Sequence, residues 1–128
     1  MEEQYTKDMP VFADVETLKE QIQPFFWVEG KSSYSVCLTV GTYLQDVFDL
    51  RAEEGFEGNG YDWTSLATVF LEECCQELEN CIAYDPEADM FCAYAEDPKA
   101  LRKFITEFQK VCQNKQKITA LFLEAELD

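Results

Sequence analysis

The sequence predicts an α+β domain, with a mainly antiparallel sheet built from two hairpins at about residues 25–40 and 81–95 and packed against helices. Residues 33–40, SYSVCLTV, alternate between apolar and polar, as in a strand with one face on a core. Helical spacing of apolar residues appears in the segments between and after the predicted hairpins. An apolar share of 47% with 14% aromatics in 128 residues is ample for the core of one domain, residues 1–128.

The first predicted elements are a short helix and a hairpin. Asp14 is placed to cap a helix over 15–22, which Pro24 ends. FFWVEG at 25–30 predicts the first strand, Gly30-Lys31-Ser32 a turn, and 33–40 the second strand. The core-facing side of the second strand is expected to carry Tyr34, Val36, Leu38 and Val40. Residues 1–13 are expected to be a loosely ordered N-terminal segment.

Two helices are predicted around a loop at 56–62. Thr42 and Gln45 fit a capping box that opens a helix to about Glu54, and Gly55 is a natural stop. Asp62 or Thr64 then caps a helix to about Glu79. The residues expected to face inward are Leu44, Val47 and Phe48 in the first helix, and Leu66, Ala67, Val69, Phe70, Cys74 and Leu78 in the second.

The C-terminal third predicts a second hairpin and two helices. CIAYD at 81–85 and MFCAY at 90–94 bracket the short connection Pro86-Glu87-Ala88-Asp89. Asp97 followed by Pro98 starts a helix to about Cys112, and a last helix runs from about Lys115 to Glu124. Their expected core residues are Leu101, Phe104, Ile105, Phe108 and Val111, then Ile118, Leu121 and Phe122.

Charge is the most distinctive feature of the composition. Twenty-six acidic against ten basic residues give a formal net charge of −16. Residues 42–97 hold fifteen acids and only Arg51 as a base, whereas residues 98–123 hold six bases and one acid. Phosphate binding needs the opposite sign, so nucleic acid is not the expected partner. A basic protein partner fits better, because complementary fields speed and orient association; solubility alone is the plainer interpretation.

Localisation and cysteine chemistry follow from what the chain lacks. The N-terminus MEEQYTKDMP has no apolar core of a secretory signal, and no apolar run approaches membrane-spanning length, so a cytoplasmic protein without membrane contact is expected. None of the six cysteines falls in a CxxC pair, and no histidine is present, which disfavours a zinc site. Buried free thiols that behave as small hydrophobic side chains are expected instead.

No catalytic set stands out in the sequence. Without histidine the usual general base is missing, and no serine or cysteine lies in a nucleophile motif, so an enzyme is not expected. Asp85, Glu87 and Asp89 imitate the spacing of a calcium loop, but Met90 occupies the position that needs glycine. The acidic residues are expected to mark a hairpin tip, with calcium or magnesium binding as the alternative; no metal or cofactor is predicted.

The loop FEGNGYDW at 56–63 permits several interpretations. Gly58 and Gly60 allow unusual backbone angles, but the surrounding acids would repel the phosphate of a nucleotide. Trp63 is expected to anchor the loop in the core, whereas Asn59 and Tyr61 are less obviously needed for packing. Part of the loop is therefore a candidate contact surface.

Two segments together carry a family resemblance. GFEGNGYDWTSLATVFLEE at 55–73 and YDPEADMFCAYAEDPKALRKF at 84–104 resemble the immunity protein 51 family of bacterial polymorphic toxin systems, and the resemblance spans about residues 24–124. It implies an antidote, made beside a secreted toxin, that binds the cognate toxin and is not an enzyme. A toxin that is a nuclease with a basic cleft would suit so acidic a domain.

The expected contact surface combines the charged loop with the hairpin tip. The residues expected to contact the toxin are Glu53, Glu54, Glu57, Asn59, Tyr61, Asp62, Asp85, Glu87 and Asp89. The alternative function is a small acidic adaptor or regulatory module that binds another basic protein.

Overall fold

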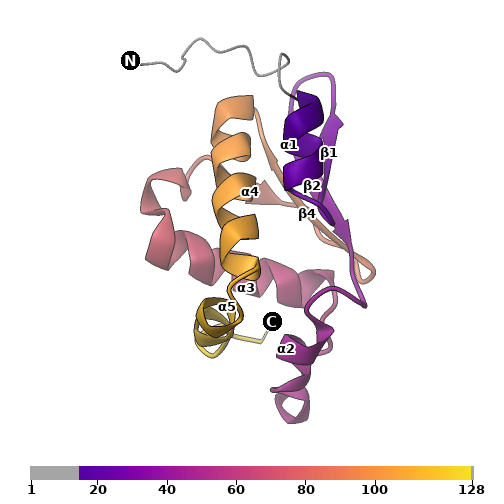
Figure 1. The fold of residues 1–128 in the computed structure, drawn as a ribbon, viewed down its shortest axis with the longest axis vertical. Helices are drawn as coiled ribbons and strands as arrows, with labels where there is room; N and C mark the ends of the chain where they lie inside the picture. The colour runs from indigo at the N-terminus through magenta and orange to yellow at the C-terminus, as the bar shows by residue number, and fades with distance from the viewer. Residues whose placement is uncertain (1–14, 128) are drawn as a thin grey trace.

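A computed structural model describes residues 15–127 of the chain (Figure 1). The expected N-terminal segment 1–13 and the Asp14 cap lie outside these residues. The elements are α1 (Val15–Gln21), β1 (Phe26–Glu29), β2 (Tyr34–Thr39), α2 (Gln45–Asp49), η2 (Ala52–Glu54), α3 (Gly60–Cys74), η3 (Gln76–Leu78), β3 (Ala83–Tyr84), β4 (Met90–Ala95), α4 (Pro98–Cys112) and α5 (Lys115–Phe122), where η marks a single turn of 3-10 helix.

The four strands form one antiparallel sheet in the order β1-β2-β4-β3. The two predicted hairpins are confirmed as β1–β2 and β3–β4, and the pairing of β2 with β4 joins them. Strand β3 is only two residues long, and a further bridge between Glu87 and Met90 extends its hairpin to the tip. The fold is therefore α+β, as the sequence predicts.

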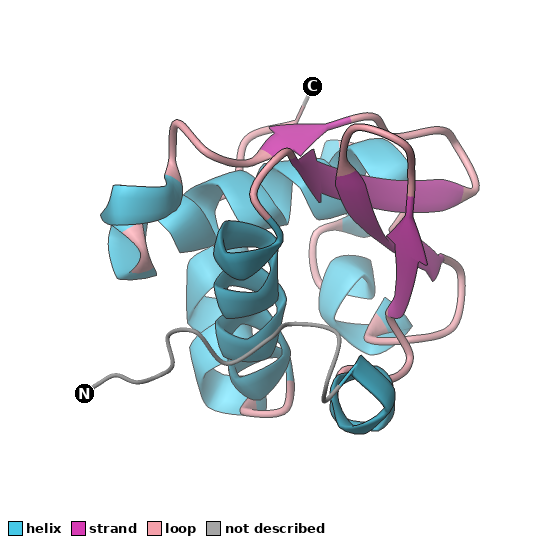
Figure 2. Cartoon of the chain, turned by 90° about the horizontal axis from the view of Figure 1, so that it is seen from above, coloured by secondary structure: helices cyan, strands magenta, loops and turns pink. Residues whose placement is uncertain are grey.

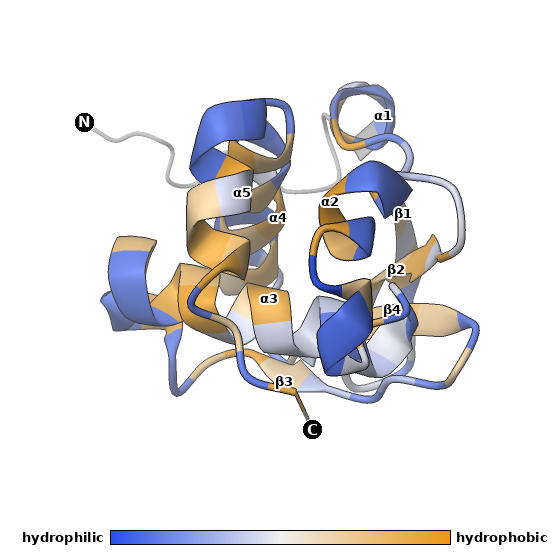
Figure 3. Ribbon diagram, turned by 90° about the horizontal axis from the view of Figure 1, so that it is seen from below, coloured by the Kyte–Doolittle hydropathy of each residue, from blue (hydrophilic) through white to orange (hydrophobic). Residues whose placement is uncertain are grey.

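The helices α3 and α4 pack against the central strands β2 and β4 on one side of the sheet, and α5 packs on both helices (Figures 1 and 2). Val36, Leu38, Phe91 and Ala93 turn toward the helices and are buried. The hydrophobic stretches of α3, α4 and α5 meet in the interior, as Figure 3 shows. The predicted core residues of α4 and α5 are all buried there.

The segment before the loop departs from the predicted capping box. Leu44 precedes α2 in the left-handed conformation, with a φ of 57°, and no side chain caps the helix. The Gln45 amide instead donates to the Glu57 carbonyl oxygen at 2.9 Å and to the Asp49 carboxylate at 3.1 Å. The long helix expected to Glu54 is thus split into α2 and η2, while Gly55 ends η2 in the left-handed conformation, as expected for a stop.

Helix α3 differs at both ends from its predicted bounds. Asn59 is its N-cap, so Gly60 is already helical, and Cys75 leaves the helix with a φ of −144°. The prediction that Cys74 faces the core is wrong, because the turn away from the helix places Cys75 inside and leaves Cys74 exposed. All six cysteines are free, but Cys81 is also exposed and Cys92 is half-buried, so burial holds only for Cys37, Cys75 and Cys112.

Candidate functional site

The β3–β4 connection forms a compact acidic tip. Glu87 and Met90 exchange backbone hydrogen bonds of 2.8 and 3.2 Å across the turn. Asp85, Glu87 and Asp89 are all exposed on it. The tip therefore presents three carboxylates on a rigid hairpin, as predicted for the acidic connection.

Asp62 organises the loop that precedes α3. Its carboxylate accepts hydrogen bonds from the Glu57 N–H at 2.7 Å and the Gly58 N–H at 2.9 Å, while the Asn59 side chain accepts from the Asp62 N–H at 2.8 Å. Such reciprocal bonds satisfy donors that a helix start leaves free. Asp62 is only 3% exposed. Its contact with a toxin stays a prediction, whereas the observed role of this buried carboxylate is to hold the backbone of its own loop.

The loop and the tip meet at Gly60. Its N–H donates to the Ala88 carbonyl oxygen at 3.2 Å. A Cβ at Gly60 would lie 2.0 Å from the Glu87 carbonyl oxygen and 2.2 Å from that of Met90. Only glycine permits this approach, so the two segments that carry the family resemblance form one joint in the fold.

Gly58 fixes the other side of the loop. It has a φ of +83°, and a Cβ there would lie 2.7 Å from the Gln45 side-chain oxygen. The Gln45 amide spans this point to reach the Glu57 carbonyl. Glu57 remains exposed and Asn59 is partly exposed, so the charged and polar edges of the loop face outward.

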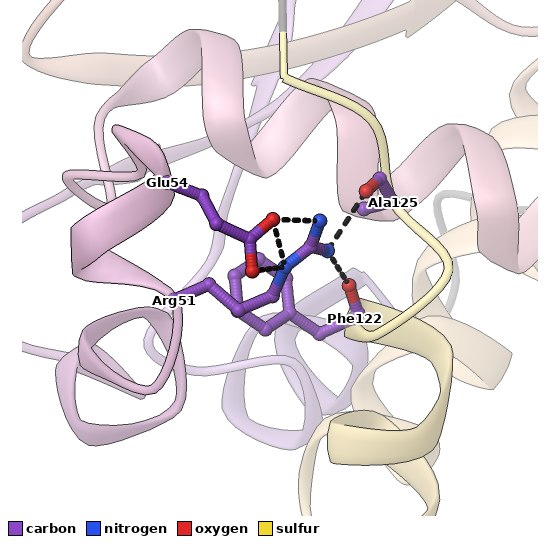
Figure 4. Close-up of polar contacts among 4 residues, drawn as sticks. All are labelled: Arg51, Glu54, Phe122 and Ala125. Carbon is purple, nitrogen blue, oxygen red and sulfur yellow. Dashed lines mark hydrogen bonds and ion pairs between the residues drawn. The ribbon is translucent and has the colours of Figure 1, made fainter.

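Glu53 and Glu54, which are both predicted contact residues, differ in their interactions. Glu53 is exposed. Glu54 forms an ion pair with Arg51 at 2.7 Å, and this hydrogen bond lowers the pKa of the Glu54 carboxyl. The Arg51 guanidinium also donates to the carbonyl oxygens of Phe122 and Ala125, at 2.6 and 2.8 Å (Figure 4). Glu54 thus holds the arginine that fastens the end of α5.

The two aromatic residues of the loop take separate roles. Trp63 is fully buried and stacks on Tyr43, with ring centroids 6.0 Å apart and planes at 8°. Its ring also contacts Phe48 and Phe25, so the expected anchor is confirmed. Tyr61 is 42% exposed and belongs to the outer surface.

We use the name acidic surface for Glu53, Glu57, Asn59, Tyr61, Asp85, Glu87 and Asp89. Two acids outside this surface pair with bases of α4 and α5: Glu77 with Lys103 at 2.8 Å and Asp46 with Lys115 at 2.6 Å. Within residues 15–127, no base forms an ion pair with a carboxylate of the acidic surface. Among the described residues, the acidic surface is therefore left without a basic partner in an ion pair.

A hollow beside α3 was not predicted from the sequence. It has a volume of about 270 Å³ and is lined by Thr64, Ser65, Thr68, Val69, Glu72, Glu124 and Glu126. The polar residues of α3 follow Tyr61 at helical spacing, which is the only local signal of this face. The glutamates after α5 join it through a contact that no local pattern indicates.

The described residues provide no group of three or more Asp, Glu, Cys or His side chains placed to hold a metal ion. In the same part of the chain, no helix combines the length and the apolar character needed to cross a bilayer.

The comparison with family models assigns the chain to a class. The model of immunity protein 51 matches residues 25–127. The chain therefore belongs to the immunity protein 51 family, which supports an immunity-protein role and implies a cognate toxin as its partner. Searches of curated proteins and of solved structures found no match.

Proposed function

We propose that this protein neutralises its cognate toxin by binding it, without catalysis, through the acidic surface. The observation that carries the proposal is the joint between loop and tip. At Gly60 the loop that carries exposed Glu57 contacts the hairpin tip that carries exposed Glu87 and Asp89, although loop and tip are far apart in the sequence.

A preorganised surface of one charge suits a basic partner. The backbone of both segments is fixed by hydrogen bonds, so binding orders little additional chain. Exposed charges of one sign attract an oppositely charged protein over about a Debye length, about 8 Å at physiological salt, and raise the association rate. Tyr61 adds an exposed aromatic ring beside the charges, of the kind that is enriched at interface centres.

The toxin surface that this edge fits is a basic one. A nuclease whose cleft binds phosphates would offer such a surface, and the carboxylates of the tip would occupy it in place of the substrate. Rapid capture is useful to an antidote, because each unbound toxin molecule continues to act.

The proposal is tested by charge reversal with a matched control. Glu57→Lys, Glu87→Lys and Asp89→Lys are combined in one variant, which is expected to lose protection when co-expressed with the toxin encoded beside it. Glu16→Lys, Glu20→Lys and Glu29→Lys make the same change of net charge in α1 and at the far end of β1, and this control is expected to protect.

Survival in both variants, with retained co-purification of the toxin, would show that the acidic surface is not the contact. Loss of protection in both variants would show that protection depends on the net charge of the protein and not on the acidic surface. Circular dichroism on both variants separates either result from unfolding.

A further inference from the structure

Two cysteines stand opposite each other on the outer face of the sheet. Cys37 in β2 is paired with Cys92 in β4 in the antiparallel register. In β1, Phe26 is paired with Cys37, so these three residues form one row across the sheet. Phe26 is 41% exposed. Tyr94 and Val28, on the next row of the same face, are 37% and 43% exposed. The cysteine pair thus lies on the side of the sheet away from the helices.

The hydrogen-bond pattern identifies the kind of pair. Val40 donates its N–H to the Asp89 carbonyl oxygen at 3.3 Å, which makes the Val40–Asp89 row a hydrogen-bonded one. Hydrogen-bonded and non-hydrogen-bonded rows alternate in antiparallel strands, so the Cys37–Cys92 row, three residues along, is non-hydrogen-bonded. The Cys92 carbonyl confirms this, because it accepts from Asp85 at 3.0 Å on the opposite side, in the β3–β4 hairpin.

That geometry suits a disulfide. In non-hydrogen-bonded rows the Cα atoms approach to about 4.5 Å and the side chains lie closest. Disulfides span Cα separations of about 4.4–6.8 Å. Both cysteines are free thiols, and each shifts the pKa of the other, which agrees with their adjacent positions in the register.

We propose that Cys37 and Cys92 form a reactive dithiol that small-molecule disulfides oxidise to a cross-strand disulfide. Cys92 is the attacking thiol and Cys37 the resolving thiol. This site lies outside the acidic surface and does not depend on the proposed toxin contact.

The division of roles follows from burial and hydrogen bonding. Cys92 is half-buried, whereas Cys37 is 7% exposed, so a reagent reaches Cys92 first. The hydrogen bond from Cys37 lowers the pKa of the Cys92 thiol, and one from Ser35 acts in the same direction, whereas burial and the carboxylates of Asp85 and Glu87 oppose the shift. The same bond and burial raise the pKa of Cys37. The thiolate, which is the nucleophile, therefore forms at the accessible member of the pair.

The chemistry balances in two exchanges. The Cys92 thiolate attacks one sulfur of the small disulfide, whose S–S bond breaks and releases one thiolate. Cys37 gives its proton to that thiolate and attacks the Cys92 sulfur. The second small thiolate leaves and takes from the solvent the proton that Cys92 released on ionising. The two protein thiols are oxidised by two electrons, and the small disulfide is reduced to two thiols.

The test uses oxidised glutathione on a Cys74→Ser, Cys81→Ser parent, which lacks both exposed cysteines. Its intact mass is expected to fall by two hydrogens, with no adduct retained, and a reductant should restore it. Digestion is expected to link the peptide of Cys37 to that of Cys92. The melting temperature of the oxidised form should rise, because the cross-link restrains the unfolded chain.

Two further substitutions separate the roles. Adding Cys37→Ser is expected to stop the reaction at one glutathione on Cys92, and Cys37→Ala serves if serine disrupts the fold. Adding Cys92→Ser is expected to abolish the reaction. A stable glutathione adduct on Cys92 in the parent, free Cys37 and Cys92 after oxidation, or a link that survives Cys92→Ser would each overturn the proposal.

Discussion

The Gly60 N–H donates to the Ala88 carbonyl oxygen across 3.2 Å, and this bond joins the start of α3 to the tip of the β3–β4 hairpin. The proposed acidic surface spans this joint, because Glu57 lies in the loop and Glu87 and Asp89 lie in the tip. Gly60 carries no charge, but the absence of a Cβ atom allows the loop and the tip, which both carry acidic residues, to come into contact.

Gly60→Ala is expected to separate α3 from the tip. The new Cβ meets backbone oxygens at 2.0 and 2.2 Å, which cannot rotate away as a flexible side chain would. We expect a loss of at least about 2 kcal/mol in the free energy of unfolding, measured in urea. Gly41→Ala is the control: it has a φ of +112° but nothing within 4 Å, so only backbone strain of about 1 kcal/mol applies. Equal losses in the two variants would contradict the steric account.

Asp62→Ala is expected to destabilise the fold, which a mere surface contact would not do. Removing the carboxylate leaves the N–H groups of Glu57 and Gly58 without their acceptor. We expect this to lower the free energy of unfolding by about 2 kcal/mol. Glu57→Lys, on the exposed edge of the same loop, should change stability by less than about 0.5 kcal/mol. A neutral Asp62→Ala variant would argue against the supporting role.

Arg51→Met is expected to release the chain after α5. Two carbonyl oxygens lose their charged donor, and Glu54 loses its partner, so we expect a loss of about 2–3 kcal/mol. Hydrogen exchange should quicken in residues 122–127 first. Lys115→Met breaks an ion pair that is exposed on both sides, so it should lower the free energy of unfolding much less than Arg51→Met does.

Glu73 and Glu124 give a pH-dependent prediction. A hydrogen bond with Glu124 raises the pKa of the Glu73 carboxyl, because the pair is favoured when it shares a proton. A raised folded-state pKa means that this stabilisation is present at low pH and is lost as the pH rises through that pKa. Glu73→Gln should therefore raise the melting temperature near pH 7 and lose that advantage near pH 4. Thermal melts of the Glu73→Gln variant and of the wild-type protein at both pH values check this, and an equal difference between the two proteins at both would contradict it.

Local pattern predicted most of the fold. The alternation in β2 and the Asp97-Pro98 start of α4 are signals that a few neighbouring residues determine, and both hold in the structure. The joint at Gly60 was not predictable, because it depends on the sheet order that brings β4 beside α3. Arg51 likewise reaches a carbonyl 71 residues away.

In the candidate site, too, some features could be predicted from the local sequence and others depend on the folded structure. Exposure of Glu57 and of the tip acids follows from turn chemistry, and the structure brings these residues together. Asp62 has the same charge but lies inside, because a helix start recruits a carboxylate for its free N–H groups. Composition cannot separate an acid that faces a partner from one that faces its own backbone.

Binding through the acidic surface is tested most directly by the rate at which the purified protein associates with its toxin, measured at increasing salt concentration. If the acidic surface binds the toxin, the rate is fast and falls steeply with salt, and a Glu57→Lys, Glu87→Lys, Asp89→Lys variant associates slowly and with little dependence on salt. The Glu16→Lys, Glu20→Lys, Glu29→Lys control should retain most of both the rate and its salt dependence. Unchanged association and salt dependence in the first variant would contradict the acidic surface as the toxin contact.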